Sequence, residues 1–476
     1  MLKFFNVNDK DVKRDVLGWI LIAISSVLLG IWAVKGTIAL RNILLGIGAL
    51  ISIKYIYQFL KNYHEKIPLK FWIPLILLGL MFCWVIAHYV FFPRFPVLQF
   101  HELTSTWLRS GLAVMLGLAT GLALQKKPCA TSLLWMGMLV SFGYLFYEYI
   151  PKAMAANSLF APDYFNYIFY GKISGVLAGT ILIAGLLGTL VDTVRREQWL
   201  LAVFVGLFCL VAVAAVLYGY VFILDTRNGV ALAVILLSIL CFKLMWDVFK
   251  APPFGGIASK GRAILIFVVI GLVTTLTWLG AEHAQHHRGW FSVWEDARIA
   301  VQVEKYPQWQ NPQEMGYPKN ASGQTVNINN YERIAWGVAG LQIFMPENPV
   351  GVGVLKGPFT FLLHEKYPQS SQHMPSTHSA WVEIGLAYGY PGLFLLLGSL
   401  IAIVFLCLGS KSPFKDLASF LSLGLIMLYT VGELSNQHAI EILCYLIALM
   451  AALLLSYEDK DSYAMRGAQQ SSKVKI

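Results

Sequence analysis

Long apolar runs, separated by short polar stretches, dominate the pattern of the chain. Because an α-helix needs about 20 apolar residues to cross the hydrocarbon core of a bilayer, each run predicts a membrane-spanning helix. Twelve runs of this kind occur: 16–35, 42–60, 71–92, 106–124, 131–150, 173–193, 199–224, 229–247, 263–280, 381–408, 416–433 and 439–456. We therefore expect an all-α polytopic membrane protein with about twelve transmembrane helices.

One long segment interrupts this pattern. Residues 281–380 are mixed in composition and carry helical apolar spacing over 295–303 and 331–344, whereas 305–330 is rich in Pro, Asn, Gln and Gly and reads as loop. The chain thus divides into helices one to nine (1–280), a large, partly helical loop (281–380), and helices ten to twelve with a tail (381–476). The loop is large enough to cover a cavity at the membrane surface.

Composition supports a membrane protein and excludes other classes. The 476 residues are 57% hydrophobic and 13% charged, with a mean hydropathy of +0.63, whereas soluble domains carry about 25% charged residues. We therefore do not expect an ordinary cytoplasmic enzyme, a disordered protein or a nucleic-acid binder. The first run has no small-residue cleavage site after it and reads as a retained helix rather than a signal peptide.

The net charge of +10 is explained by membrane topology. Alternate short loops and the two tails hold 20 Lys and Arg residues, whereas the opposite set holds six. The positive-inside rule then places both termini in the cytoplasm and segment 281–380 outside, which fits an even number of spans. The predicted cytoplasmic loops are too short for a nucleotide-binding domain, and the chain has no GxxxxGK[ST] motif.

Histidines are distributed unequally across the predicted membrane. Nine of the ten fall on the outer side, and His64 alone lies in a cytoplasmic loop. Because histidine transfers protons near neutral pH, this bias places any chemistry on the outer face, although imidazole also suits wet interfaces. The outer histidines are His88, His101, His283, His286, His287, His364, His373, His378 and His438. The six cysteines form no metal-binding spacing and read as small core residues.

Three arginines on the outer side are candidates for binding an anion. Arg227 lies in Leu-Asp-Thr-Arg-Asn-Gly, in a very short turn between predicted spans, and reads either as an interfacial arginine or as a clamp for a phosphate headgroup. Arg333 belongs to an amphipathic helix ahead of Pro349, and Arg298 is expected to begin an earlier helix. For both, a solvated helix face or a local salt bridge is the alternative.

Histidines at the same surface are candidates for proton transfer. His378, in Ser-Thr-His-Ser at the mouth of predicted span ten, can accept a proton from a sugar hydroxyl or merely begin the helix. Glu383 follows five residues later, with an intramembrane role or helix capping as its alternatives. The cluster His283, His286 and His287 has no HExxH pattern, so we expect a structural or interfacial role and no metal.

Five loose motifs in a fixed order resemble the O-antigen ligase/polymerase superfamily. They are Thr-Arg-Asn-Gly (226–229), Glu-Arg-x3-Gly (332–337), Glu-Asn-Pro-x-Gly-x-Gly (347–353), His-Ser-x3-Glu-x-Gly (378–385) and Gly-Tyr-Pro-Gly-Leu (389–393). The motif-bearing region covers about 200–395, and twelve spans with one large loop between spans nine and ten resemble the ligase layout. Ser379 stands where many relatives have Asn.

The resemblance implies a GT-C-like glycosyltransferase that works without a metal or cofactor. Its donor would be a glycan on undecaprenyl diphosphate and its acceptor a sugar hydroxyl of lipid A-core at the periplasmic face. Arg227 and Arg333, with Arg298 as a third, would bind the diphosphate; His378 would activate the acceptor, and Arg333 would also act in catalysis. Glu383, Gly351 and Gly353 would support the site. An O-antigen polymerase and a protein O-oligosaccharyltransferase with the same donor remain alternatives, and a flippase a more distant one.

Overall fold

The computed structural model describes residues 15–62, 67–160, 168–196, 198–250, 257–287, 289–320, 323–370 and 376–455. Within these ranges the chain is helical, with two isolated bridges and no β-strand. Helices occupy all twelve predicted runs, and ten helical stretches of the described chain are long and apolar enough to cross a membrane. The protein is therefore an all-α polytopic membrane protein, as expected.

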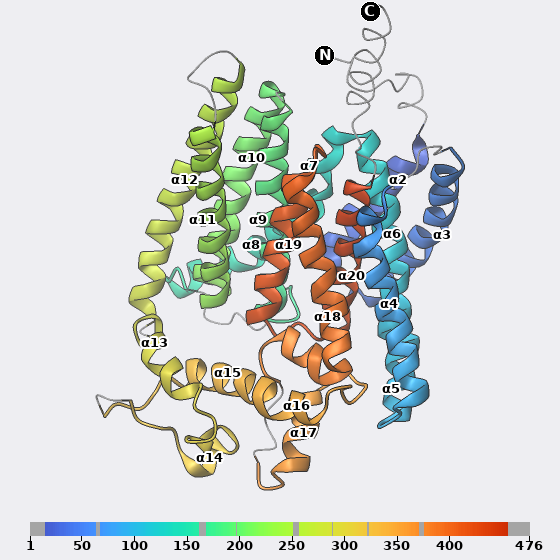
Figure 1. Ribbon diagram of the computed structural model, residues 1–476. Coiled ribbons are helices and arrows are strands. Elements are labelled where there is room, and N and C mark those ends of the chain that lie inside the picture. Colours follow the sequence, from blue (N-terminus) through green and yellow to red (C-terminus); the bar gives the residue numbers. More distant parts are fainter. Residues whose placement is uncertain are drawn as a thin grey trace, which may run out of the picture.

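The bundle forms the larger part of the molecule (Figure 1). Its helices are α2 (Val16–Ile31), α3 (Ile38–Asn62), α4 (Leu69–Phe91), α5 (Pro96–Glu102), α6 (Leu108–Lys126), α7 (Thr131–Leu134), α8 (Met136–Ala156), α9 (Lys172–Arg195), α10 (Trp199–Tyr218), α11 (Arg227–Lys250), α12 (Ile257–His286), α18 (Ala380–Gly409), α19 (Lys415–Val431) and α20 (Gln437–Leu454). Helices α2 and α19, with 16 and 17 residues, are shorter than the other spans, so their crossing of the membrane stays a prediction. His64 and His373 lie outside the described residues.

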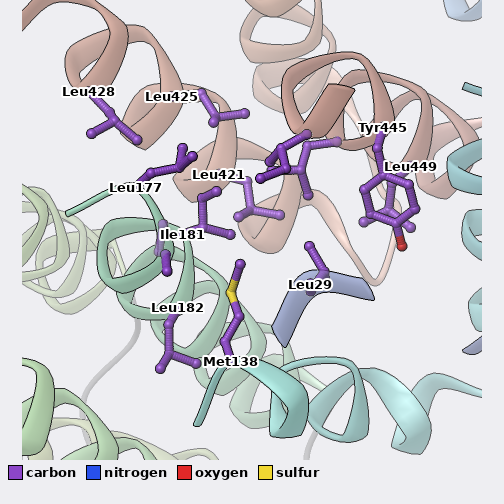
Figure 2. Close-up of a cluster of buried hydrophobic side chains, with 14 of the residues drawn as sticks. Leu29, Met138, Leu177, Ile181, Leu182, Leu421, Leu425, Leu428, Tyr445 and Leu449 are labelled. Atoms are coloured by element: carbon purple, nitrogen blue, oxygen red, sulfur yellow. The ribbon is translucent and has the colours of Figure 1, made fainter. Parts of the chain in front are cut away.

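Helices α9 and α20 form the centre of the bundle. In their apolar windows 94% and 89% of the residues are buried, so these two helices contact other helices on nearly every side. Figure 2 shows Leu177 and Ile181 of α9 close to Leu421 and Leu425 of α19, with Tyr445 of α20 nearby. Helices α9 and α20 therefore contact protein rather than lipid along most of their length, and the other helices pack around them.

Helices α6 and α20 cross closely because α6 presents glycines at the crossing. A Cβ atom on Gly117 would lie 2.3 Å from the carbonyl oxygen of Tyr445, and one on Gly121 would lie 2.6 Å from that of Leu449. Real Cβ contacts do not come this close, so only glycine permits this approach. Small residues four apart are a common device for packing membrane helices backbone to backbone.

The large loop folds against one end of the bundle (Figure 1). Its elements are α13 (Gly289–Ala300), α14 (Pro312–Met315), α15 (Ile328–Ala339), α16 (Met345–Glu347) and α17 (Pro358–Lys366), so the helix expected over 331–344 begins earlier and continues through a π-helical turn. Helix α12 runs to His286, past the expected boundary at residue 280. A second hydrophobic core holds the loop together, with Trp309 and Phe344 near its centre. The loop is thus a packed unit.

Candidate functional site

A cavity of about 460 Å³ lies where the loop meets the bundle. It is lined by Lys172, Ile173, Asp225, Thr226, Arg227, Asn228, Gln285, His286, His287, Gly289, Asn327, Asn329 and Arg333. The lining comes from the starts of α9, α11 and α13, the end of α12, and α15 with its cap residue. Two of the three predicted arginines therefore share one cavity with a lysine and two histidines.

The local fold at the α10–α11 turn fixes Arg227 in this cavity. Helix α10 ends in a π-helical turn, Gly219–Ile223, and α11 begins at Arg227 itself. Between them Asp225 has a left-handed φ of 48°, which turns the chain within three residues. Arg227 Nη1 donates a hydrogen bond of 2.8 Å to Asn330 Oδ1 on α15. The guanidinium is therefore anchored both in the bundle and in the loop.

Asn330 connects Arg227 to a buried carboxylate. Its amide nitrogen donates to Asp296 Oδ2 at 2.8 Å and to the carbonyl oxygen of Gly289 at 3.0 Å. Asp296 is fully buried and also accepts hydrogen bonds from Ser292 and from the backbone of Asn327. Because buried carboxylates are costly unless paired, this network locks α13 and α15 together behind the arginine.

Arg333 lies one turn after Asn330 and faces the same cavity. Its guanidinium makes no hydrogen bond or ion pair with any residue that the structure describes, although Glu433 and Arg227 lie close enough to act through charge. Burial among protein atoms lowers the pKa of Arg333, and the positive charge of Arg227 adds to that effect. Two guanidiniums that face one cavity have the charge and the hydrogen-bond donors that an anion requires, so an anion-binding role for the pair stays a prediction.

His378 does not line the cavity but lies close to it, packed against α15. Its ring stacks on Trp336 with 5.6 Å between centroids, and Trp336 is one turn along α15 from Arg333. His378 Nδ1 lies 3.2 Å from Glu433 Oε2. A proton on Nδ1 that is shared with this carboxylate leaves Nε2 with its lone pair, which is the arrangement of a general base.

Glu433 follows α19 and was not anticipated from the sequence. Burial alone would raise its pKa, but the hydrogen bond and charge of His378, the hydroxyl of Ser376 and the charge of Arg333 together lower it. The backbone places it there, because Ala380 donates a hydrogen bond of 2.9 Å to the carbonyl oxygen of Gly432. The carboxylate therefore couples His378 to the arginine pair.

Glu383 hydrogen-bonds to the chain just before His378. It is fully buried, and its Oε1 accepts a 2.6 Å hydrogen bond from the backbone nitrogen of Thr377. The loop that this bond holds brings His378 into the left-handed region, at a φ of 57°, where a non-glycine residue costs conformational energy. This bond goes to a residue ahead of the N-cap of α18, Ser379, so Glu383 fixes the chain that leads into the helix, and an intramembrane role stays a prediction.

Gly351 and Gly353 do not line the cavity. They have φ values of 84° and 87°, and the nitrogens of Val352 and Gly353 donate to the carbonyl oxygens of Leu386 and Ala387 at 2.9 and 2.6 Å. A Cβ on Gly351 would lie 2.4 Å from the oxygen of Ala387. The glycine motif therefore fastens the loop to the kink in α18 and supports the site from a distance.

Arg298 is not brought together with the other arginines. It lies in the last turn of α13 rather than beginning a helix, and its side chain is exposed over Trp294, 6.0 Å from the ring centroid. On the buried face of the same helix Asp296 points to Asn330. Since residues two apart on a helix face different directions, Arg298 points away from the cavity.

The cavity also contains a histidine–carboxylate pair that sequence reasoning missed. His287 Nε2 contacts Asp225 Oδ1, and His283 Nε2 lies 3.5 Å from the same oxygen. Hydrogen bonds from these histidines and the charge of Lys172 outweigh burial and hold the pKa of Asp225 well below its ordinary value. Asp225 lies about 60 residues from the histidines, so only its position next to Arg227 in a short outer turn could have suggested the contact.

Comparison with models of known protein families and with curated protein sequences found no match.

Proposed function

We propose that the protein is a glycosyltransferase of the O-antigen ligase type. It transfers a glycan from undecaprenyl diphosphate to a sugar hydroxyl of lipid A-core at the periplasmic face of the bacterial inner membrane. The single observation that carries the proposal is that Arg227 and Arg333 share one cavity, with the His378–Glu433 pair adjoining it. The motif order seen in the sequence supports the same assignment.

The chemistry follows from these positions. A diphosphate leaves a sugar readily only when its developing negative charge is offset, and two arginines held at the bundle end do this by preorganised charge. His378, with Nδ1 on Glu433, removes the acceptor proton through Nε2, a contribution of about 10²–10⁴-fold for a general base. The energy for transfer comes from the bond between the glycan and the diphosphate of the donor, so the reaction needs no ATP. A single displacement of this kind inverts the configuration at the anomeric carbon.

The structure also suggests why loop and bundle must both be present. Arg227 belongs to α11, whereas Arg333 and Asn330 belong to α15 of the loop. His378 precedes α18, and Glu433 follows α19. The donor diphosphate would be held between these parts, at the depth where a lipid-linked substrate presents its headgroup.

Transfer in vitro tests the proposal. The purified protein, in detergent with a defined undecaprenyl-diphosphate glycan, should glycosylate lipid A-core. The variants His378→Ala and Arg333→Ala should abolish transfer. The control His101→Ala, at an exposed position of α5, should retain it. Activity only toward a second lipid-linked glycan would identify a polymerase instead, and activity toward a peptide would identify a protein O-oligosaccharyltransferase. Movement of the donor across vesicles without transfer would indicate a flippase. Wild-type activity in His378→Ala would refute the assigned base.

A further inference from the structure

The His287–Asp225 pair occupies the wall of the arginine cavity and has no role in the reaction described so far. Both residues line the cavity together with Arg227 and Arg333. His287 is partly exposed to it, with a relative side-chain exposure of 29%. A titratable side chain that reaches the anion site is positioned to exchange a proton with whatever anion binds there.

The hydrogen bonding of the neighbouring His283 argues against a metal. The three potential ligand atoms of Asp225, His283 and His287 lie within 4.8 Å of one another. However, Trp290 Nε1, which can only donate, gives a 3.1 Å hydrogen bond to His283 Nδ1. A neutral ring whose Nδ1 accepts must carry its proton on Nε2, so the atom aimed at Asp225 has no lone pair for a cation. Metal-ligating histidines normally donate through the second nitrogen instead.

Charged groups from several elements surround His287. It follows His283 and His286 of α12, and from the other elements it faces Asp225, Lys172 of α9, Arg227 of α11 and Arg333 of α15. Asp225 offers the ring an opposite charge through its contact with Nε2. A diphosphate bound between the arginines would place a second opposite charge in the same cavity.

We propose that His287, oriented by Asp225, is a second catalytic histidine that protonates the leaving diphosphate. The proposal rests on the glycosyl transfer proposed above and adds a general acid to it. Nε2 of His287 is held by Asp225, so the proton transferred is the one on Nδ1. The two histidine–carboxylate pairs then act on opposite partners: His378 with Glu433 on the acceptor, and His287 with Asp225 on the donor.

The step balances without any further reactant. The acceptor oxygen forms a bond to the anomeric carbon while the bond from that carbon to the diphosphate oxygen breaks, and its electron pair stays on the oxygen. The acceptor proton passes to His378, and the Nδ1 proton of His287 passes to a terminal phosphate oxygen. One histidine ends protonated and the other neutral, and exchange with water restores both.

The pH dependence of transfer tests this assignment. A general acid must be protonated, so the rate falls as pH rises through its titration, whereas loss of the base appears as pH falls. We expect His287→Gln to lower kcat by about 10²–10⁴-fold near neutral pH and to lose the alkaline limb of the profile. The acidic limb should remain, and His101→Gln should match the wild type. An unchanged profile in His287→Gln overturns the assignment, as does inhibition by EDTA that zinc reverses.

A binding measurement separates this inference from the function on which it rests. Methylenediphosphonate, a diphosphate that cannot be cleaved, should be titrated into the protein in buffers of different ionisation enthalpy. The wild type should take up protons on binding at a pH of about 7.5, and His287→Gln should take up fewer. If the wild type transfers no glycan, the proposed function fails, while proton uptake still decides whether His287 is the proton carrier; equal uptake in the variant refutes it.

Discussion

Arg227 Nη1 donates to Asn330 Oδ1 at 2.8 Å, and this bond joins the first residue of α11 to the first turn of α15. The two residues are 103 positions apart in the chain. Asn330 in turn donates to buried Asp296, so a charge at the end of the bundle is oriented by two helices of the loop. The direction of this guanidinium is therefore a property of the fold as a whole and not of its turn alone.

Replacing Arg227 by Lys should impair transfer although the charge is kept. An ammonium presents a point charge, whereas the guanidinium donates to Asn330 with one nitrogen and offers the others to phosphate oxygens in a planar fork. We expect a loss of kcat/KM of about 10²-fold, the typical cost of removing one preorganised donor. Steady-state kinetics with the defined donor measure it. Full activity in Arg227→Lys would show that net charge alone suffices.

A methyl group at Gly289 should displace the guanidinium of Arg227. A Cβ there would lie 2.3 Å from Arg227 Nη1, so Gly289→Ala must push the guanidinium aside, and a misplacement of about 1 Å costs up to 10²-fold in rate. The matched control is Gly280→Ala, because a Cβ at Gly280 of α12 meets no atom within 4 Å. Thermal unfolding should show both variants folded; equal kinetics of the two would contradict the positioning role.

The sequence could indicate which motif residues would come together, although their role in binding a diphosphate stays a prediction. Arg227 and Arg333 share a cavity, as the common outer location of their motifs suggested, and His378 adjoins it. Arg298 shows the limit: the apolar spacing around it predicted a helix of the loop but not which face of that helix the arginine occupies. That face is set by Asp296, which turns inward to Asn330.

The carboxylates of the two histidine pairs were not predictable. Glu433 reaches His378 across 55 residues, through the contact between the start of α18 and Gly432. Asp225 reaches His287 because α12 packs beside the α10–α11 turn. Both contacts depend on how spans are arranged in the bundle, and apolar periodicity does not encode which helices become neighbours.

Arg298→Ala should leave transfer nearly intact. The side chain is exposed and rests on Trp294, a contact worth roughly 0.5–1 kcal/mol at an exposed site, and it does not line the cavity. We expect less than about a twofold change in kcat/KM, since a surface substitution away from the site rarely exceeds 0.5 kcal/mol. Assays beside Arg333→Ala provide the comparison. A loss as large as that of Arg333→Ala would bring Arg298 back into the donor site.

Gly389→Ala should destabilise the protein at the kink of α18. Gly389 has a φ of 67°, and a Cβ there would lie 2.1 Å from the carbonyl oxygen of Pro349. The left-handed backbone alone costs a non-glycine residue about 1–3 kcal/mol, and the clash adds to it. Gly79→Ala, in open space within α4, should instead be neutral or gain up to about 1 kcal/mol. Unfolding temperatures in detergent compare the two variants. Equal shifts would show that the close contact between Gly389 and Pro349 does not stabilise the fold.

Glu433 should make stability depend on pH. Its pKa in the folded protein lies below the ordinary value of 4.5, so the folded state binds the proton less readily than the unfolded state. The stabilisation is therefore complete above the ordinary pKa and is lost as pH falls through the lowered one.

Glu433→Gln removes this contribution at every pH. The unfolding temperature of the wild type should exceed that of Glu433→Gln near neutral pH, and the gap should narrow as the pH falls below the ordinary pKa of 4.5. Glu314→Gln, at an exposed residue of α14, should show a gap that stays small and constant. A gap for Glu433→Gln that does not narrow in acid would mean that the His378–Glu433 contact does not stabilise the fold.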